Sequence, residues 1–419
     1  MMRRRTTKSC AVVDMFCGIG GLTHGFVREG FHVLAGYDSD ANCKYAYEVN
    51  NKRAKFVEKK IEDTDPTEIS ALFPADKIKV LVGCAPCQPF SLYTVKQPKD
   101  EKWKLLTRFQ NIIESACPEI VSMENVPELT RHKIFTKFVR RLEALGYHVW
   151  HDIVFCPDYG VPQSRRRLVL LASRFGNLEL VKKTHPERKW RTVWDAIGKL
   201  EPIDAGQRSK QDRIHRARSL NKTNLQRIRK TTMGGSWKDW PEKLQLACHK
   251  KSTGATYRSI YGRMDWDQPA PTLTTHCTGI GNGRFGHPEQ DRAISLREAA
   301  LLQTFPRRYR FVHPREKVFS KVLSRQIGNA VPVRLGQIIA RSIRKHLELV
   351  RINPNRRNGS PHASSAQLPH VLRTDQRHST RAAGSMRTSQ TRLQVPKACQ
   401  NSSRQSRPRA GKTKARGLH

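Results

Sequence analysis

The chain has 419 residues, 37% of them hydrophobic, so it is long enough for two or three domains with a sizeable core. Its 77 Lys and Arg residues outnumber 36 Asp and Glu residues and give a formal net charge of +41. This charge suits a polyanion, with nucleic acid favoured over an anionic membrane surface. There is no apolar run of 18 residues and no signal-peptide pattern, so we expect a cytoplasmic protein without a transmembrane helix. The ten cysteines have no regular spacing, which indicates reduced thiols.

Residues 11–174 alternate between short apolar runs and apolar residues at helical spacing. The apolar runs predict strands at residues 11–13, 32–35, 79–82, 120–123, 149–155 and 168–172. Phenylalanines and leucines at helical spacing between residues 135 and 145 predict a helix that ends at Gly146, a C-cap. Strands and helices of these lengths predict an α/β fold, a doubly wound domain around a mostly parallel sheet.

The rest of the chain changes character in three steps. Residues 176–290 are rich in glycine and basic residues and hold five of the seven tryptophans, so we expect a smaller, loop-rich domain. Helical signals return over residues 291–350, which we expect to pack back on the first domain, residues 1–175. Residues 351–419 hold 15 Lys or Arg, one acidic residue and no aromatic residue, which predicts a disordered basic tail. This tail either adds nonspecific DNA affinity or has no task.

A glycine-rich turn follows the first predicted strand, with the sequence DMFCGIGG at residues 14–21. Glycines let a backbone approach a ligand closely, and a helix N-terminus adds N–H groups. Asp38 ends the second strand, 18 residues after Gly20, where a carboxylate can bind ribose hydroxyls. The spacing is neither G-x-G-x-x-G nor a P-loop, so a tight turn without a ligand remains an alternative.

A cysteine between two prolines follows the third strand, in the sequence GCAPCQPFS at residues 83–91. Cys87 therefore lies beyond the carboxyl end of a strand, where open sheets bind ligands, and its neighbours limit the movement of the loop. A thiol is a strong nucleophile once it is ionised. Two alternatives remain: Cys84 and Cys87 could form a redox pair or half of a zinc site, or Cys87 could be inert. No second Cys or Cys/His pair completes a metal site, so we expect no metal.

Three further stretches carry polar side chains at predicted strand ends or turns. Glu124, in SMENVPEL, ends a strand at the same edge and is a candidate acid or base-reading group. Gln163, Arg165 and Arg167 alternate, so in an extended segment they share one side. Arginine forks there suit a phosphate or a carbonyl oxygen. QIGNAVPV, residues 326–333, predicts a turn followed by the last helix. Each stretch alone could be an ordinary surface loop.

The stretches together resemble the cytosine-5 DNA methyltransferases of bacteria. DMFCGIGG, GYDSD, GCAPCQPFS, ENV, QSRRR, REAALLQTFP and QIGNAVPV occur in this order, and the resemblance covers about residues 11–345. GGSW, YGRMDWDQPAPTLTT and NGRFGHPEQDR are similar to the target-recognition region of that family. The resemblance implies a Rossmann-like sheet for S-adenosylmethionine-dependent methyl transfer, joined to a loop-rich target-recognition domain.

The resemblance also implies a reaction. Cys87 attacks carbon-6 of a cytosine that is flipped out of duplex DNA, and carbon-5 then takes the methyl group of S-adenosylmethionine. Glu124 holds the ring at N3 and the exocyclic amine, and Arg165 and Arg167 lie near the base and the backbone. Redox chemistry at Cys84 is not implied, so Cys84→Ala is expected to leave methylation largely intact, in contrast to Cys87→Ala.

The cofactor positions are carried over from the family motifs. They are Phe16, Gly18, Gly20, Gly21, Asp38, Ser39, Ile61, Pro86, Leu105, Asn329 and Val331. Two positions depart from the family pattern. Ser39 stands where an aromatic residue is common, and Lys60 stands where an Asp usually binds the adenine amine. Asp63 is the candidate replacement, and we expect normal catalysis with weaker cofactor affinity.

The resemblance implies duplex DNA as the partner, with a nucleoid-associated monomer as the expected state. The resemblance is compatible with two situations: the enzyme has a cognate restriction endonuclease in the same system, or it is an orphan methylase. The rivals are a transfer-RNA methyltransferase on the same fold and a noncatalytic DNA-binding regulator; the long target region favours DNA, and the intact motifs favour catalysis. The recognised sequence is not readable, but residues 192–275 are expected to carry the readout, with Arg258, Arg263 and 272–275 as candidates.

Overall fold

The computed structural model describes residues 9–85, 100–251, 254 and 259–352, and the side chains of residues 100–103 are not included. The chain divides into two compact units. The larger comprises Met1–Leu244 with Arg258–Pro361, and the smaller comprises Gln245–Tyr257 with His362–His419. All elements and sites discussed below belong to the larger unit. None of the described helices is both long enough and apolar enough to cross a membrane.

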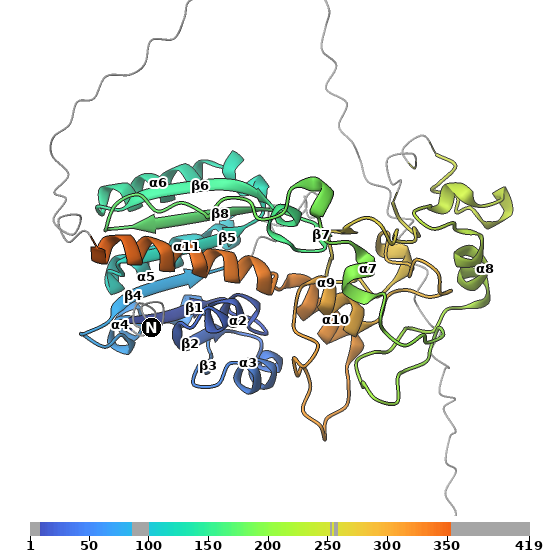
Figure 1. Cartoon of the computed structure of the whole chain (residues 1–419), viewed down its shortest axis with the longest axis horizontal. Helices are drawn as coiled ribbons and strands as arrows, with labels where there is room; N and C mark the ends of the chain where they lie inside the picture. Colours follow the sequence, from blue (N-terminus) through green and yellow to red (C-terminus); the bar gives the residue numbers. More distant parts are fainter. Residues whose placement is uncertain (1–8, 86–99, 252–253, 255–258, 353–419) are drawn as a thin grey trace, which may run out of the picture. The chain divides into compact units, whose positions relative to one another are not determined.

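A seven-stranded sheet forms the centre of the larger unit, in the order β3-β2-β1-β4-β5-β8-β6 (Figure 1). Its strands are β1 (Cys10–Met15), β2 (His32–Asp38), β3 (Lys55–Glu58), β4 (Ile78–Gly83), β5 (Ile120–Asn125), β6 (His148–Phe155) and β8 (Arg166–Ser173). Pairs among the first five strands are parallel, while β8 is antiparallel to both β5 and β6. Only β8 therefore runs against the others, which confirms the predicted α/β class and the mostly parallel sheet.

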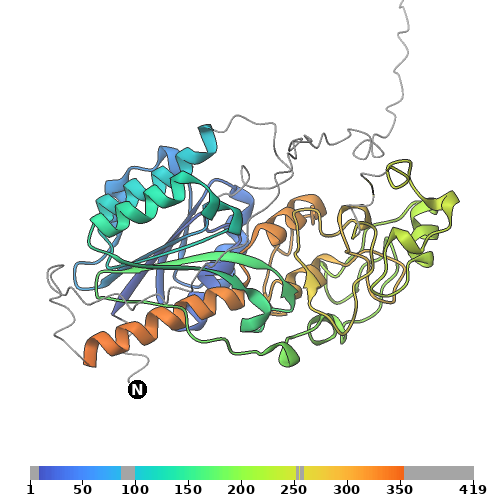
Figure 2. The ribbon, with the colours of Figure 1, turned by 90° about the horizontal axis from the view of Figure 1, so that it is seen from above.

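Helices cover both faces of this sheet. The helices among the described residues are α2 (Gly21–Arg28), α3 (Lys44–Asn50), α4 (Pro66–Leu72), α5 (Asp100–Ala116), α6 (Lys133–Ala144), α7 (Val193–Ile197), α8 (Lys222–Lys230), α9 (Leu296–Leu302), α10 (Ser320–Asn329) and α11 (Val333–Ile352). Of these, α7 to α10 lie away from the sheet (Figure 1). Figure 2 shows α5 and α6 on one side of the sheet and the orange helix α11 on the other. The predicted helix end at Gly146 is confirmed, because Gly146 has φ 85° and its N–H donates to the Glu143 carbonyl.

The central strands β1, β4 and β5 are buried on both faces, as a covered parallel sheet requires, whereas the edge strands β3 and β6 are partly exposed. In β1 every residue is buried, and successive side chains alternate between two core clusters. Cys10 and Val12 face the cluster with α2 and α11, whereas Val13 and Met15 face the cluster with α5 and α6. This burial explains why the strands appear in the sequence as continuous apolar runs.

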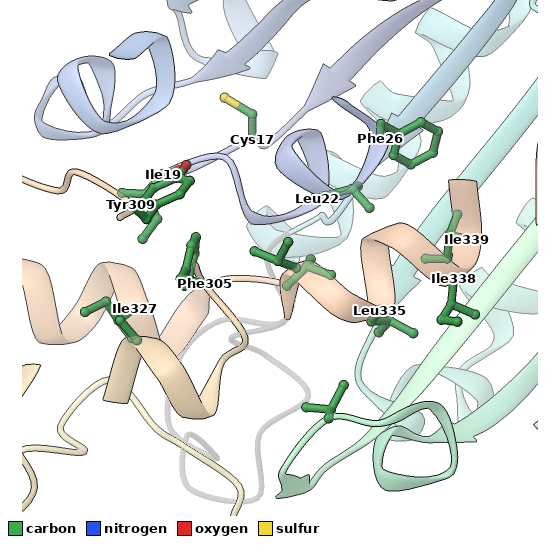
Figure 3. Close-up of a cluster of buried hydrophobic side chains, with 14 of the residues drawn as sticks. Cys17, Ile19, Leu22, Phe26, Phe305, Tyr309, Ile327, Leu335, Ile338 and Ile339 are labelled. Carbon is green, nitrogen blue, oxygen red and sulfur yellow. The ribbon is translucent and has the colours of Figure 1, made fainter. Parts of the chain in front are cut away.

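The C-terminal segment packs on the glycine turn. Phe305, Tyr309 and Leu335 lie with Ile19 and Leu22 in one core cluster (Figure 3). The Tyr309 hydroxyl donates to the carbonyl of Ile19, at the start of α2. These side chains of the C-terminal segment therefore pack at the edge that carries the candidate site, while the assignment of residues 291–350 to the first domain stays a prediction.

The loop-rich region between β8 and α9 contains little regular structure among its described residues. It has the short helices α7 and α8, several 3-10 turns and the two-residue strand β9 (Ala270–Pro271). β9 pairs in parallel with β7 (Gln163–Ser164). Two small apolar clusters support the region, one around Ile228 and Ile280 and one around Trp237 and Trp240. This region is loop-rich, as expected from the sequence. The pairing of β9 with β7 connects it to the segment just before β8.

Candidate active site

The candidate catalytic and cofactor residues lie where the parallel strands end. Met15 of β1 pairs with Gly83 of β4, and Gly83 pairs with Met123 of β5, so these strands stop at one level. Glu124 follows Met123, and Asp38 is the last residue of β2. Open α/β sheets bind their ligands at this edge. The glycine turn, the start of the Cys87 loop and Glu124 thus meet at one place.

Glu124 is a carboxylate buried to 2% exposure with a cation on one oxygen and a thiol on the other. Arg167 Nε lies 3.0 Å from Oε1, and the Cys84 thiol donates a hydrogen bond to Oε2 over 2.7 Å. Glu124 pairs with Val169 across the β5–β8 ladder, so Arg167 is its diagonal neighbour on the same face. A buried carboxylate requires such partners. The thiol hydrogen bond orients Oε2 at the sheet edge, while Arg167 supplies Oε1 with an ion pair and no hydrogen bond.

Arg165 is a second buried cation close to Glu124. Its Nη1 donates to the Leu273 carbonyl at 3.4 Å, and its buried Nε has no partner among the described residues. Burial, and next the neighbouring Arg167 charge, lower the pKa of Arg165 to about 10, while Glu124 acts in the opposite direction. A buried guanidinium with an unused donor is suited to an oxygen acceptor of a ligand.

Gln163 shares the buried side with Arg165, while Ser164 and Arg166 are exposed, as the alternation predicts. The Gln163 amide, however, does not contact Glu124. Its Oε1 accepts from the Leu273 N–H at 3.0 Å, and its Nε2 donates to the Gln303 side chain at 3.0 Å. Gln163 therefore joins the segment before β8 to the loop-rich region and to α9.

The start of the predicted nucleophile loop is held by the residue after Glu124. Asn125 Nδ2 donates to the Ala85 carbonyl at 3.1 Å. The preceding residue of the loop, Cys84, donates its thiol to Glu124. Pro86 and Cys87 follow directly, and both lie outside the described residues. The ENV stretch therefore has a local task that its sequence did not indicate: it fixes the end of β4 beside the carboxylate.

The glycine turn is closed by Asp38. Its Oδ2 accepts the Gly18 N–H at 2.8 Å and its Oδ1 accepts the Asp40 N–H at 2.9 Å. Burial raises the pKa of Asp38, and these two N–H groups oppose that rise. The turn forces Phe16 to φ 62°, a rare conformation for a non-glycine residue, and Gly18 faces open space. Space beside Gly18 and a carboxylate next to it are what a bound cofactor would need.

The next two glycines are required by packing. A Cβ on Gly21 would lie 2.2 Å from the Val331 carbonyl oxygen, and one on Gly20 would lie 2.7 Å from Asn51 Nδ2. Gly20 also has φ 84°. The alternative of a purely structural turn thus accounts for Gly20 and Gly21, whereas Gly18 faces space that no described residue fills.

The other cofactor candidates are spread over the same edge. Ile61 is buried, and Phe16 and Leu105 are half-buried against the same core cluster. Val331 is buried against Gly21, whereas Asn329 is exposed at the end of α10. The structure thus groups Phe16, Ile61 and Leu105 on one side of the turn and places Val331 on the other.

The adenine end predicted to depart from the family pattern is exposed. Ser39 is exposed after β2, and Lys60 and Asp63 are exposed at the two ends of a 3-10 turn, Ile61–Asp63. No hydrogen bond of the Asp63 side chain occurs among the described residues. The replacement role suggested for Asp63 therefore stays a prediction.

Asp14 was not singled out as a functional residue from the sequence. It is buried in β1, and its Oδ2 accepts the Thr23 hydroxyl at 2.6 Å. Its Oδ1 is buried without a partner among the described residues. Burial raises the pKa of Asp14 to about 7. The signal was present in the sequence, because Asp14 is the one charged residue that interrupts the apolar run AVVDMF.

One candidate for base readout is corrected by the structure. Arg263 is 4% exposed, and its three guanidinium nitrogens donate to backbone carbonyls, including those of Thr231 and His287, and to Asp291. Arg263 therefore stabilises the loop-rich region, and its guanidinium group is not available to bind DNA bases. Arg258 lies outside the described residues. The described residues contain no cluster of three or more His, Cys, Asp or Glu arranged to hold a metal.

Comparison with known proteins defines the class to which this fold and site belong. Residues 10–345 match the family model of the C-5 cytosine-specific DNA methylases. The chain belongs to this family and is a DNA cytosine-5 methyltransferase.

Individual relatives agree with this assignment. The chain is 56% identical over 341 residues to the Type II methylase M.HgiDII of Herpetosiphon aurantiacus, covering 81% of this chain and 96% of the relative. It is 29% identical to the Type II methyltransferase M1.HphI of Haemophilus parahaemolyticus, covering 80% and 87%. The fold is similar to that of an E. coli prophage protein, a candidate DNA modification methyltransferase, with TM-score 0.63 and 23% identity over 81% of this chain and 99% of that one.

Proposed function

We propose that this enzyme methylates carbon-5 of a cytosine flipped out of duplex DNA, with Cys87 as nucleophile and S-adenosylmethionine as methyl donor. The observation that supports this most is the Glu124 cluster. A buried carboxylate at the ligand-binding edge pairs with Arg167 and accepts a hydrogen bond from the Cys84 thiol, and Cys84 lies three residues before Cys87 in the sequence. A flipped base needs such a fixed polar group to replace its lost pairing partner.

The residues of the chain then divide the work as follows. The Cys87 thiolate forms a bond to carbon-6, and the electron pair of the C5–C6 bond moves to carbon-5. Glu124 holds N3 and the exocyclic amine, which stabilises the charge that develops on the ring. Carbon-5 would take the methyl group from the sulfur of S-adenosylmethionine, and that sulfur would keep the bonding electron pair and leave as a thioether. The carbon-5 proton would then pass to water, and the electron pair of the C5–H bond would re-form the C5–C6 double bond and expel the Cys87 thiolate. Arg165 and Arg167 bind oxygen acceptors of the base and its backbone.

The residues of the glycine turn fit S-adenosylmethionine. Bound there, this cofactor would supply an electrophilic methyl group. The open space beside Gly18 and the neighbouring Asp38 carboxylate suit a ligand with ribose hydroxyls. The unpartnered Asp14 oxygen lies in the strand that leads into the turn. Phe16, Ile61, Leu105 and the other carried-over positions would form the pocket wall, with Ser39 and the 3-10 turn at the adenine end.

The division of the chain supports a DNA substrate. Residues 1–175 and 291–350 would form the catalytic domain, residues 176–290 would recognise the target, and residues 351–419 would form a basic tail. The net charge of +41 favours a polyanion. Because the similar relatives are Type II enzymes, we propose that this enzyme, acting as a monomer, protects DNA from a restriction enzyme, with orphan methylation as the alternative.

The test is covalent trapping. Duplex DNA with 5-fluorocytosine at random cytosines is incubated with S-adenosylmethionine and with wild type, Cys87→Ser or the control Cys117→Ser. Fluorine cannot leave carbon-5 as a proton does, so a true nucleophile stays attached. We expect a denaturation-resistant adduct with wild type and Cys117→Ser but not with Cys87→Ser. No adduct despite normal DNA binding would contradict the mechanism, and an adduct formed with transfer RNA alone would move the substrate to RNA.

A further inference from the structure

A second cavity lies apart from the Glu124 site. It has a volume of about 330 Å³ and is bounded by the last turn of α2, the α7 region and the first turns of α11. Its polar lining comes from Arg28, His185, Arg191, Asp195, Thr304, Arg334 and Gln337. None of Cys84, Glu124, Arg165 and Arg167 lines it. Nothing in the proposed mechanism uses this cavity.

The positive charges in this cavity outnumber the acidic groups, with three arginines and one carboxylate in the lining. Arg28 and Arg191 have no hydrogen bond and no ion pair within the described part of the chain. Arg334 uses its Nε on the Tyr159 carbonyl at 3.0 Å, which leaves its terminal nitrogens for another acceptor. The one carboxylate in the lining, Asp195, is engaged, because it accepts the Thr192 N–H in the cap of α7.

The nearest other acid is also engaged. Glu29 follows Arg28, but it forms ion pairs with Arg341 and Arg344 of α11. The first backbone N–H groups of α11 are not free to bind an anion, since those of Val333 and Arg334 donate to Gln303 and Thr304. A ligand in the cavity would therefore be held by side chains.

Gln337 supplies an independent sign of a missing partner. It is only 9% exposed, it lines the cavity one turn after Arg334, and its amide has no hydrogen bond among the described residues. Buried side-chain amides are normally satisfied. An amide left open beside three guanidinium groups indicates an acceptor-rich ligand in this space.

The electrostatic environment agrees with that reading. Burial, then the nearby Arg341 and Arg191, lower the pKa of Arg334. Burial, then Arg334 and Arg191, lower the pKa of His185. The cations therefore repel one another across the cavity, and a bound anion would relieve this repulsion.

We propose that this cavity binds a phosphate group. A phosphate has acceptor oxygens that point in several directions. It can therefore bind guanidinium groups that reach the cavity from α2, from α11 and from the α7 region. The volume is about ten times that of one water molecule, so a phosphate with part of its ester fits. Two sources share this chemistry: a free phosphate ester and a phosphodiester of the DNA backbone. The proposal does not depend on methyl transfer.

The test compares two double variants of the full-length enzyme. Arg28→Gln with Arg191→Gln removes two exposed cavity cations. Arg131→Gln with Arg140→Gln removes two exposed arginines around α6 that have no ion pair among the described residues; they lie on the other face of the sheet, and the change in charge is the same. Inorganic phosphate is titrated calorimetrically at constant ionic strength, and DNA affinity is measured against salt concentration.

We expect the cavity variant to bind phosphate at least tenfold more weakly, and the control variant to match wild type. If the ligand is a DNA phosphodiester, the slope of log K against log salt also falls by about 0.9 in the cavity variant alone. An unchanged slope with weakened phosphate binding assigns the site to a free phosphate ester. If the cavity variant equals the control in both measurements, the proposal is wrong.

Discussion

Replacing Cys84 by alanine is expected to slow methyl transfer without changing substrate binding. The structure gives Cys84 a task that the sequence did not show, because its thiol donates to Glu124 Oε2 at 2.7 Å. The other carboxylate oxygen is held by Arg167. Without the thiol, Glu124 keeps its cation but can turn about it, and the buried oxygen loses its donor. The carboxylate is then less well placed for a base in the transition state.

The magnitude follows from the type of contact. A hydrogen bond to a charged group contributes about 1.5–3 kcal/mol, and a thiol is a weaker donor than N–H or O–H, so we expect a contribution of about 1 kcal/mol, just below this range. A loss of about 1 kcal/mol corresponds to about a fivefold lower kcat. This effect is small beside the loss expected from Cys87→Ala, so it agrees with the sequence-based expectation that Cys84→Ala leaves methylation largely intact.

The assay is single-turnover methylation of duplex DNA, with KM for DNA and for S-adenosylmethionine measured in parallel. Cys84→Ser keeps a donor and should recover most of the rate, while Cys117→Ala removes an exposed thiol and serves as the control. We expect kcat to fall and both KM values to stay the same. Equal losses in Cys84→Ala and Cys84→Ser, or no loss in either, would refute a hydrogen-bonding role for this thiol.

Three further predictions concern the glycine turn, pH and the tail. Gly21→Ala should lower the free energy of unfolding by about 1–3 kcal/mol, because its Cβ would lie 2.2 Å from the Val331 carbonyl oxygen; urea unfolding equal to wild type would contradict this. Burial lowers the pKa of His287 to about 4, below its value in the unfolded chain. The free energy of unfolding should therefore fall by about 3 kcal/mol as the pH falls from 6.5 towards 4, because the unfolded chain takes up the proton first. His287→Gln should remove this part of the pH dependence, and identical pH profiles of the two proteins would speak against it. Deleting residues 353–419, which follow α11, should weaken nonspecific DNA binding and flatten its salt dependence with little change in site preference; equal salt slopes would exclude that role.

The sequence predicted the sheet where strands are buried on both faces. β1, β4 and β5 each contain a short apolar run, and they were located within a few residues. The edge strand β3 was missed, since only Phe56 of its four residues is fully buried and no apolar run marks it. The position of β8 between β5 and β6 was also missed, because strand order depends on long-range pairing that no local pattern encodes.

In the candidate site, too, features set by local sequence were predicted and features set by distant contacts were not. Glu124 and Arg167 were singled out because they lie in short motifs next to strands, and their contact in the structure follows from the ladder register. The role of Cys84 depends on a contact with a residue 40 positions away. The burial of Arg263 depends on carbonyls of residues 228, 231, 287 and 290, so its sequence context gave no indication of it. Residue type predicts possible chemistry, while distant partners decide whether the group is free to perform it.

The segment expected to read bases is bonded to the strand that carries the candidate catalytic arginines. The Leu273 N–H donates to Gln163 and its carbonyl accepts from Arg165, while the Thr272 hydroxyl donates to the Ser164 carbonyl. A Cβ on Gly328 of α10 would lie 2.2 Å from the Thr274 carbonyl oxygen, so this segment is enclosed from the other side as well. A displacement of residues 272–275 on DNA would therefore move the backbone that holds Arg165. Residues 272–275 and Arg165 are therefore mechanically coupled, because the same hydrogen bonds hold both.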